Sequence, residues 1–221
     1  MSQTLSASTL LIVPLAPLAG ALLAGVFGTT FGGNWIGRRM SHTITILGVL
    51  VAFVISAMTL KSVAIDGARF NESIYTWMEV GGLKMEVGFL IDSLTAMMMC
   101  VVTFVSLMVH IYTIGYMAHD EDNWPEGSKA GTNSYQRFFS YISLFTFSML
   151  MLVMSNNMLQ LFFGWEAVGL VSYLLIGFWF NKPSAIFANM KAFMVNRVGD
   201  FGFILGIGLI AAFANTLNYG E

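Results

Sequence analysis

Six stretches of the chain are apolar over the length that a helix needs to cross a membrane. A bilayer core about 30 Å thick takes about 20 helical residues, and only helices or closed barrels satisfy every backbone hydrogen bond in lipid. Because these runs are continuous, we expect an all-α integral membrane protein in which 1–221 form a single membrane domain. The spans are predicted near 9–28, 43–62, 92–117, 138–155, 158–180 and 185–213.

In the segment 65–90, between the second and third spans, the apolar residues follow a different pattern. Two β-prone runs, "SIYTWMEV" and "LKMEVGFLI", flank the pair Gly81 and Gly82, and apolar and polar residues alternate in the second run. This pattern predicts a short external β-hairpin, the alternative being an irregular loop. We expect the edge of the second run to be exposed and to invite a partner strand or subunit.

Composition supports the membrane assignment. The chain is 57% hydrophobic and 10% charged, against about a quarter charged in soluble domains, and its mean hydropathy is +0.74. The net charge of −2 argues against a nucleic-acid partner. Cys100 stands alone, so we expect no disulfide, no cysteine metal site and no redox chemistry in this chain. No motif predicts catalytic, metal-binding or cofactor-binding residues.

The basic residues of the connections predict an orientation. Arg38 and Arg39 precede the second span, Lys129 and Arg137 precede the fourth, and Lys182 follows the fifth. Alternation of the spans puts these three connections on one side of the membrane. Because cytoplasmic loops carry an excess of Lys and Arg, we expect this side to be cytoplasmic and both termini to lie outside.

A single carboxylate, Glu166, lies inside the fifth span, in "LFFGWEAVGL". A charge at the centre of a membrane helix costs about 2.5–3.5 kcal/mol on insertion scales, so we expect Glu166 to face a neighbouring helix rather than lipid. Its basic partner is either Arg197 or a Lys or Arg beyond this chain. A fixed ion pair and a place on a proton path both fit such a residue.

The sixth span holds three charges: Lys191, Arg197 and Asp200. Arg197 and Asp200 share a helix face at i,i+3, and Lys191 points the opposite way or extends to the interface. Because the fifth and sixth spans are antiparallel, Arg197 lies at nearly the depth of Glu166. We therefore expect a Glu166–Arg197–Asp200 cluster, either bracing the bundle or taking part in function.

Two further polar residues belong to the third span. Asp92 stands at its outer end, where a carboxylate typically caps a helix. His110 lies deep among apolar residues, where a helix-packing role competes with a role in a proton relay.

The motifs "GWEAVGLVSYLLIGFW", "MKAFMVNRVGDFGF" and "FLIDSLTAMM" resemble the large antiporter-like membrane subunit of respiratory complex I, the NuoL type, in its N-terminal part. The resemblance implies that Glu166 is the family's buried glutamate, which modulates or relays a proton. It also implies that Arg197 and Asp200 belong to the family's "RVGD" motif. Asp92 and His110 match polar positions of the third span.

The same resemblance implies a subunit of an enzyme, the proton-translocating NADH:quinone oxidoreductase. FMN, iron–sulfur clusters and quinone are then expected in other subunits, with no cofactor in this chain. The implied partners are the lipid bilayer and the other membrane subunits of complex I, including the C-terminal spans of this subunit type. The implied location is the bacterial inner membrane, with the mitochondrial inner membrane as the alternative.

The family has more spans than this sequence, including one with the lysine that usually partners the buried glutamate. A split subunit, a truncated product and an incomplete sequence all fit that difference. Two other functions remain open: a subunit of a multisubunit cation/proton antiporter, and a non-transporting membrane scaffold.

Overall fold

The computed structural model describes residues 5–80, 83–125, 128–214 and 216–219. Within them, six helices are long and apolar enough to cross a membrane, which confirms the six expected spans. They are α1 (Ala7–Leu22, continued by a π-helical turn at Leu23–Phe27), α2 (Arg38–Asp66), α3 (Ser93–Tyr116), α5 (Ser134–Val153), α6 (Met158–Ile176) and α7 (Pro183–Ala214). Short helical turns occupy the connections, among them Thr30–Gly32, Asp120–Asn123 and α4 (Lys129–Thr132).

Two boundaries differ from the expectation. Helix α2 begins at Arg38, so Arg38 and Arg39 belong to the helix and not to the loop before it. Helix α6 ends at Ile176, capped by Gly177, and the aromatic residues after it form a turn. Apolar residues continue beyond a helix wherever a loop packs against protein, so hydropathy alone does not locate the end.

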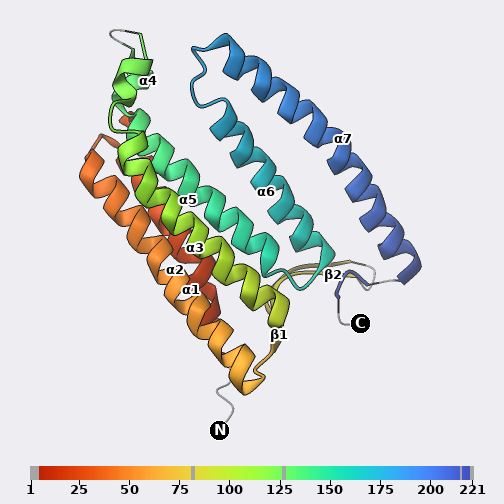
Figure 1. The fold of residues 1–221 in the computed structure, drawn as a ribbon. Helices are drawn as coiled ribbons and strands as arrows, with labels where there is room; N and C mark the ends of the chain where they lie inside the picture. Colours follow the sequence, from red (N-terminus) through yellow and green to blue (C-terminus); the bar gives the residue numbers. More distant parts are fainter. Residues whose placement is uncertain (1–4, 81–82, 126–127, 215, 220–221) are drawn as a thin grey trace.

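Helices α1, α2, α3 and α5 form a bundle, and α6 packs on α5 while α7 packs mainly on α6 (Figure 1). Small and hydroxyl residues let the bundle helices approach closely. The hydroxyls of Ser140 and Ser143 on α5 donate to the carbonyls of Ala21 and Pro17 at 2.7 and 2.8 Å. A side chain at Gly48 of α2 would lie 2.7 Å from the carbonyl oxygen of Ala16. Close backbone packing of this kind holds membrane helices together where the hydrophobic effect does not.

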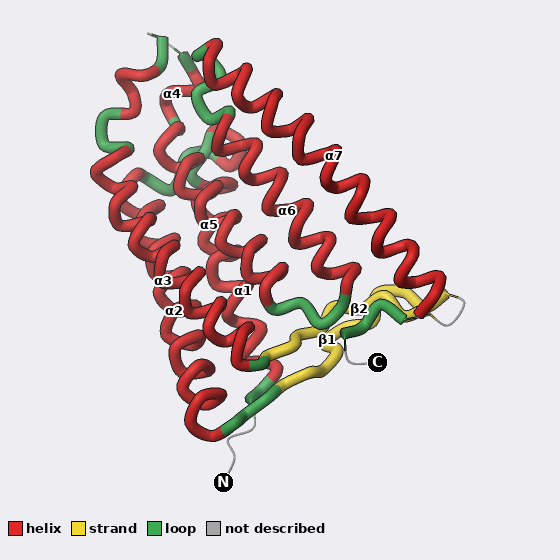
Figure 2. Tube along the Cα trace, turned by 45° about the vertical axis from the view of Figure 1, so that its right-hand side comes forward, coloured by secondary structure: helices red, strands yellow, loops and turns green. Residues whose placement is uncertain are grey.

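The predicted hairpin is present as strands β1 (Phe70–Val80) and β2 (Leu83–Ile91), paired antiparallel from Phe70 opposite Ile91. The turn at Gly81 and Gly82 lies outside the described residues. Figure 2 shows the hairpin running across the helix ends, from the side of α2 and α3 toward α6 and α7.

The edge of β2 is not free, so the expectation of an exposed edge on this strand was wrong. The backbone N–H groups of Gly88 and Leu90 donate to the side chain of Gln160 at 2.9 Å and to the carbonyl of Met154 at 3.0 Å. The amide of Asn157 donates to the carbonyl of Glu86 at 2.9 Å. The turn between α5 and α6 therefore continues the sheet and fixes the hairpin against the helix ends.

The same turn also binds the segment that follows α7. The N–H of Met158 donates to the carbonyl of Leu217 at 2.9 Å, and the N–H of Tyr219 donates to the carbonyl of Asn156 at 3.2 Å. The end of α7 is thereby tied to the start of α6.

The opposite ends of these helices are joined by Asp120, which is 2% exposed. Its carboxylate accepts hydrogen bonds from the indoles of Trp124, at 3.0 Å, and Trp179, at 2.8 Å. The guanidinium of Arg137 lies over the ring of Phe178, 4.8 Å from its centroid. These contacts, which we call the Asp120 latch, link the loop after α3 to the loop between α6 and α7.

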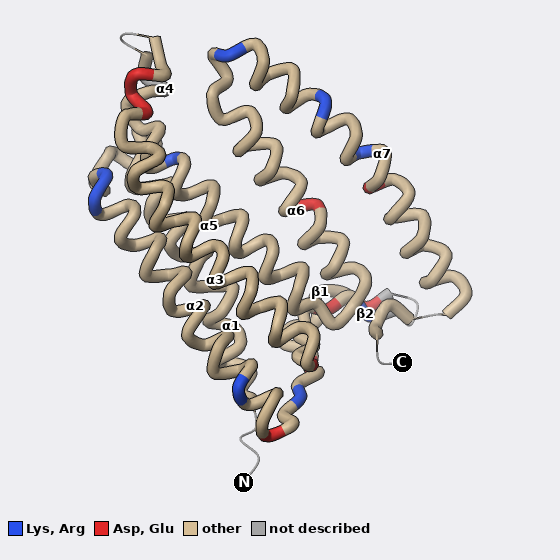
Figure 3. The backbone as a smooth tube through the Cα atoms, in the orientation of Figure 1, with Lys and Arg blue, Asp and Glu red and all other residues tan. Residues whose placement is uncertain are grey.

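The basic connections gather at one end of the bundle and the hairpin lies at the other, as alternation of the spans requires (Figure 3). Between the two ends, the charged residues lie on α6 and α7. Among the described residues, the charges within the membrane helices are therefore concentrated in this one helix pair.

We predict that Asn157→Ala loosens the hairpin and the start of α6. Asn157 caps α6 by accepting from the N–H of Gln160 at 2.8 Å while it donates to Glu86. Loss of a cap and of a buried hydrogen bond typically costs about 1–3 kcal/mol. Hydrogen exchange at Gly88 and Leu90 should become faster. Asn71→Ala, at an exposed position of β1, is the matched control, and equal protection in both variants would contradict the anchoring role.

Candidate functional site

Glu166 lies in the middle of α6, on the side that faces α7. The opposite side of α6 is pressed against α5, because a side chain at Gly164 would lie 2.7 Å from the backbone of Leu152. The side chain of Glu166 is 24% exposed. It does not stand alone in lipid, as the cost of an unpaired charge in the membrane requires.

Arg197 of α7 supplies the basic partner of Glu166. Its Nη1 contacts Oε2 of Glu166 and lies 3.3 Å from Oδ2 of Asp200, one turn along the same helix. The guanidinium also lies over the ring of Phe193, 5.0 Å from the centroid. The expected contact of Glu166 with a basic group is confirmed, and so is the grouping of these three charges.

One guanidinium thus serves two carboxylates. If all three groups are ionised, the cluster carries a net charge of −1. A net charge in a low-dielectric surrounding is unfavourable. In this arrangement Arg197 can pair with either carboxylate.

Asp200 is the most enclosed member of the cluster and, with Ile207, one of the two buried residues of α7 among those described. Its Oδ1 accepts a hydrogen bond from the indole N–H of Trp165 at 2.8 Å. Sequence reasoning did not single out Trp165. Trp165 is 50% exposed. The available signal was a tryptophan next to a carboxylate inside a span, because an indole N–H can act only as a donor.

A small cavity of about 20 Å³ lies between α6 and α7 beside this cluster. Arg197, Asp200, Ser172 and Asn196 contribute to its lining. A space of about 10–15 Å³ with several polar neighbours suffices for one water molecule. The cluster therefore has room for a water molecule next to its charged groups.

The structure does not bring Lys191 and His110 into this cluster. Lys191 is exposed on α7 and forms no hydrogen bond or ion pair with any described residue. His110 is fully buried between α3 and α5, and its Nδ1 donates to the carbonyl of Ser106 at 2.8 Å. Its Nε2 has no partner among the described residues.

Asp92 caps α3, as the sequence indicated. Its Oδ1 accepts a hydrogen bond from the N–H of Thr95 at 2.7 Å, and this bond lowers the pKa of the carboxyl group. A lowered folded-state pKa means that the stabilisation is present above the usual carboxyl range and is lost as the pH falls through the lowered value. The carboxylate stabilises the start of α3 at neutral pH.

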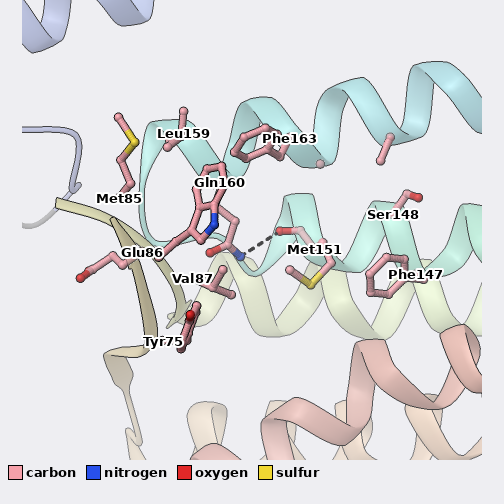
Figure 4. A pocket seen from close by; sticks show the side chains of 13 residues that line it. Tyr75, Met85, Glu86, Val87, Phe147, Ser148, Met151, Leu159, Gln160 and Phe163 are labelled. Atoms are coloured by element: carbon pink, nitrogen blue, oxygen red, sulfur yellow. Dashed lines mark hydrogen bonds between the residues drawn. The ribbon is translucent and has the colours of Figure 1, made fainter. Parts of the chain in front are cut away.

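A pocket of about 480 Å³ lies between the hairpin and the adjoining ends of α5 and α6 (Figure 4). Its walls are mainly apolar, with Trp77, Phe147 and Phe163 among them. The polar atoms of Gln160 are already bonded, to Gly88 and to the carbonyl of Met151. Figure 4 shows the carboxylate of Glu86 directed away from the pocket. Neither Gln160 nor Glu86 therefore offers a free polar group to the pocket.

Two family profiles match the chain. Residues 77–139 match "NADH-Ubiquinone oxidoreductase (complex I), chain 5 N-terminus", and residues 155–221 match "NADH:quinone oxidoreductase/Mrp antiporter, TM". The second match contains Glu166, Arg197 and Asp200.

Curated relatives agree with these profiles. NADH-quinone oxidoreductase subunit L of Neisseria meningitidis serogroup B is 66% identical over 214 residues, which are 96% of this chain and 29% of the relative. The subunit L of Rhodobacter capsulatus is 47% identical over 89% of this chain and 26% of its own. NADH-ubiquinone oxidoreductase chain 5 of Chondrus crispus is 40% identical over 95% of this chain and 29% of its own. The chain therefore spans less than a third of the length of these relatives.

A solved structure shares the fold. A chain of the membrane-bound sulfane sulfur reductase, an archaeal respiratory membrane complex, superposes with a TM-score of 0.72 at 18% identity. The match covers 96% of this chain and 29% of that one.

We predict that Glu166 and Arg197 are energetically coupled. Removing either charge, by Glu166→Gln or Arg197→Gln, should destabilise the protein by about 1–2 kcal/mol, the range for polar contacts between membrane helices. The double variant should lose less than the sum of the two. Unfolding by denaturing detergent in mixed micelles measures the three values, with Lys191→Gln as the control. Additive losses would show that the two groups do not interact.

Proposed function

The chain belongs to the family of antiporter-like membrane subunits of NADH:quinone oxidoreductase, whose N-terminal part it matches, and on this premise we propose that it forms part of a proton path across the membrane. The observation that carries the proposal is the sharing of Arg197 between Glu166 and Asp200 inside the membrane. Placing an ionisable residue inside the membrane costs free energy, so such residues mark ion or proton paths.

In this proposal Glu166 is the group that changes state. Burial favours the neutral form of a carboxyl group, and a neighbouring guanidinium favours the anion. When charge changes at a neighbouring site, Arg197 moves from Glu166 toward Asp200, which lies on its own helix. Glu166 then gains a proton, and the return of Arg197 drives that proton onward. A water molecule in the cavity beside Arg197 would carry it over the next step.

The redox chemistry belongs elsewhere in the assembly. We place FMN, iron–sulfur clusters and quinone in other subunits, so that NADH oxidation drives this chain only through charge and conformation. Lys191, exposed on α7 without a partner among the described residues, is proposed to face further spans of the subunit or another membrane subunit. His110 and Asp92 are given structural roles.

We assign the assembly to the bacterial inner membrane, since the bacterial relatives reach the highest identities among those compared. The basic connections before α2, before α5 and after α6 are placed on the cytoplasmic side, by the positive-inside rule. The hairpin then lies on the outer side.

A second function keeps support from one observation, because the profile matched by residues 155–221 also names the Mrp antiporter. A cation/proton antiporter subunit would exchange sodium for protons without NADH. Proton movement that requires a sodium gradient and ignores NADH would favour this alternative.

We predict that Glu166→Gln lowers proton translocation in the assembled oxidoreductase by at least about tenfold, the factor for losing one charged interaction of about 1.4 kcal/mol. Electron transfer from NADH to quinone should fall less, or only as far as it is coupled to pumping. Proton uptake and NADH oxidation are measured together in proteoliposomes.

Glu72→Gln, at an exposed position of β1, removes a carboxylate outside the membrane helices and serves as the matched control. It should leave both rates unchanged. A Glu166→Gln variant that assembles and pumps at the normal rate and proton-to-electron ratio would refute the proposal.

A further inference from the structure

Two consecutive residues of α6 contact two residues of α7 in a closed ring. Trp165 donates to Asp200, Asp200 lies beside Arg197, Arg197 contacts Glu166, and Glu166 follows Trp165 in the chain. Each helix contributes one donor and one acceptor. The ring therefore contains two links between the helices, of which one is an ion pair and the other an indole–carboxylate hydrogen bond.

We propose that Trp165 is a positioning residue for this site: its indole N–H holds Asp200 in place, so that Arg197 remains shared with Glu166. The proposal rests on the proposed function of Glu166 and adds to it the residue that keeps the ion pair exchangeable. Trp165 itself takes no proton.

The first argument concerns the oxygens of Asp200. The residue is only 9% exposed, and its two oxygens are divided between Trp165 and Arg197. Without the indole, Oδ1 would be left without a donor in a low-dielectric surrounding, which is costly for a charged group. Arg197 lies three residues before Asp200 on the same helix and carries further N–H groups. Its guanidinium would therefore turn fully toward Asp200. Glu166 would then lose its partner among the described residues.

The second argument concerns the geometry of the indole. Its ring packs edge-on against Phe203 of α7, with centroids 5.8 Å apart. Phe203 in turn contacts Phe162 of α6, at 5.7 Å. Trp165 is 50% exposed, and this contact with Phe203 orients the enclosed side of its ring. We expect the hydrogen bond to Asp200 to persist when the contact between Glu166 and Arg197 opens, and to keep the two helices in register.

Two substitutions separate the N–H from the bulk of the ring. Trp165→Phe keeps an aromatic ring and removes the donor. Trp165→His removes the six-membered ring but keeps a donor. Its Nε2–H takes the place of the indole N–H, because the imidazole and the five-membered ring of the indole have similar shapes. Proton translocation in the assembled oxidoreductase should fall roughly tenfold in Trp165→Phe, the factor for losing a hydrogen bond to a charged group. It should be largely retained in Trp165→His.

Infrared spectroscopy of the same preparations reports the hydrogen bond directly. Asp200→Asn identifies the carboxylate bands of Asp200. These bands should shift in Trp165→Phe, and Trp165→Phe should cause no further change in the Asp200→Asn background. Trp35→Phe is the control, since Trp35 is 82% exposed in the loop before α2 and has no part in the site or the latch. It should leave the Asp200 bands and the pH profile of translocation unchanged.

Equal losses in Trp165→Phe and Trp165→His would show that ring packing matters and the N–H does not, and would overturn the proposal. Unshifted Asp200 bands, or normal translocation in Trp165→Phe, would also overturn it. Glu166→Gln in the same assay tests the proposed function separately. If that variant pumps normally while the Asp200 bands shift in Trp165→Phe, the proton path is refuted and the hydrogen bond stands.

Discussion

The sharing of one guanidinium between two carboxylates is the constraint around which the α6–α7 pair is built. Arg197 can satisfy Asp200 within its own helix, and it can satisfy Glu166 only if α6 lies at the right depth and rotation. Because an unpaired charge in the membrane is costly, this contact fixes how the two helices meet. It also explains why α7, otherwise little buried, encloses a carboxylate at its contact with α6.

The rest of the fold serves to place α6. Serine hydroxyls of α5 bind carbonyls of α1, so α5 is fixed in the bundle. Gly164 then lets α6 approach the backbone of α5. The side of α6 that bears Glu166 is consequently turned toward α7. The site depends on hydrogen bonds and small residues at some distance from any charged group.

Much of this arrangement could be predicted from the sequence. Runs of apolar residues located the spans, alternation around Gly81 and Gly82 located the hairpin, and helical spacing with antiparallel packing grouped Glu166 with Arg197 and Asp200. These features follow from periods and depths that a sequence records. The contact between Trp165 and Asp200 could not be predicted in the same way, because the direction of an indole N–H depends on packing between helices. The coverage of the β2 edge by the turn at 154–157 likewise depends on tertiary contacts that hairpin periodicity does not contain.

The Asp120 latch has a mechanical consequence for the helix pair. It fastens the loop between α6 and α7 at one end, while the turn before α6 holds the segment after α7 at the other. Because both ends of the α6–α7 pair are fastened, we expect the two helices to keep their spacing and tilt, with little freedom to slide or separate. What remains free is the torsion of long side chains between the clamps. We therefore expect a change of partner by Arg197 to need rotation about only a few side-chain bonds, on the timescale of rotamer exchange.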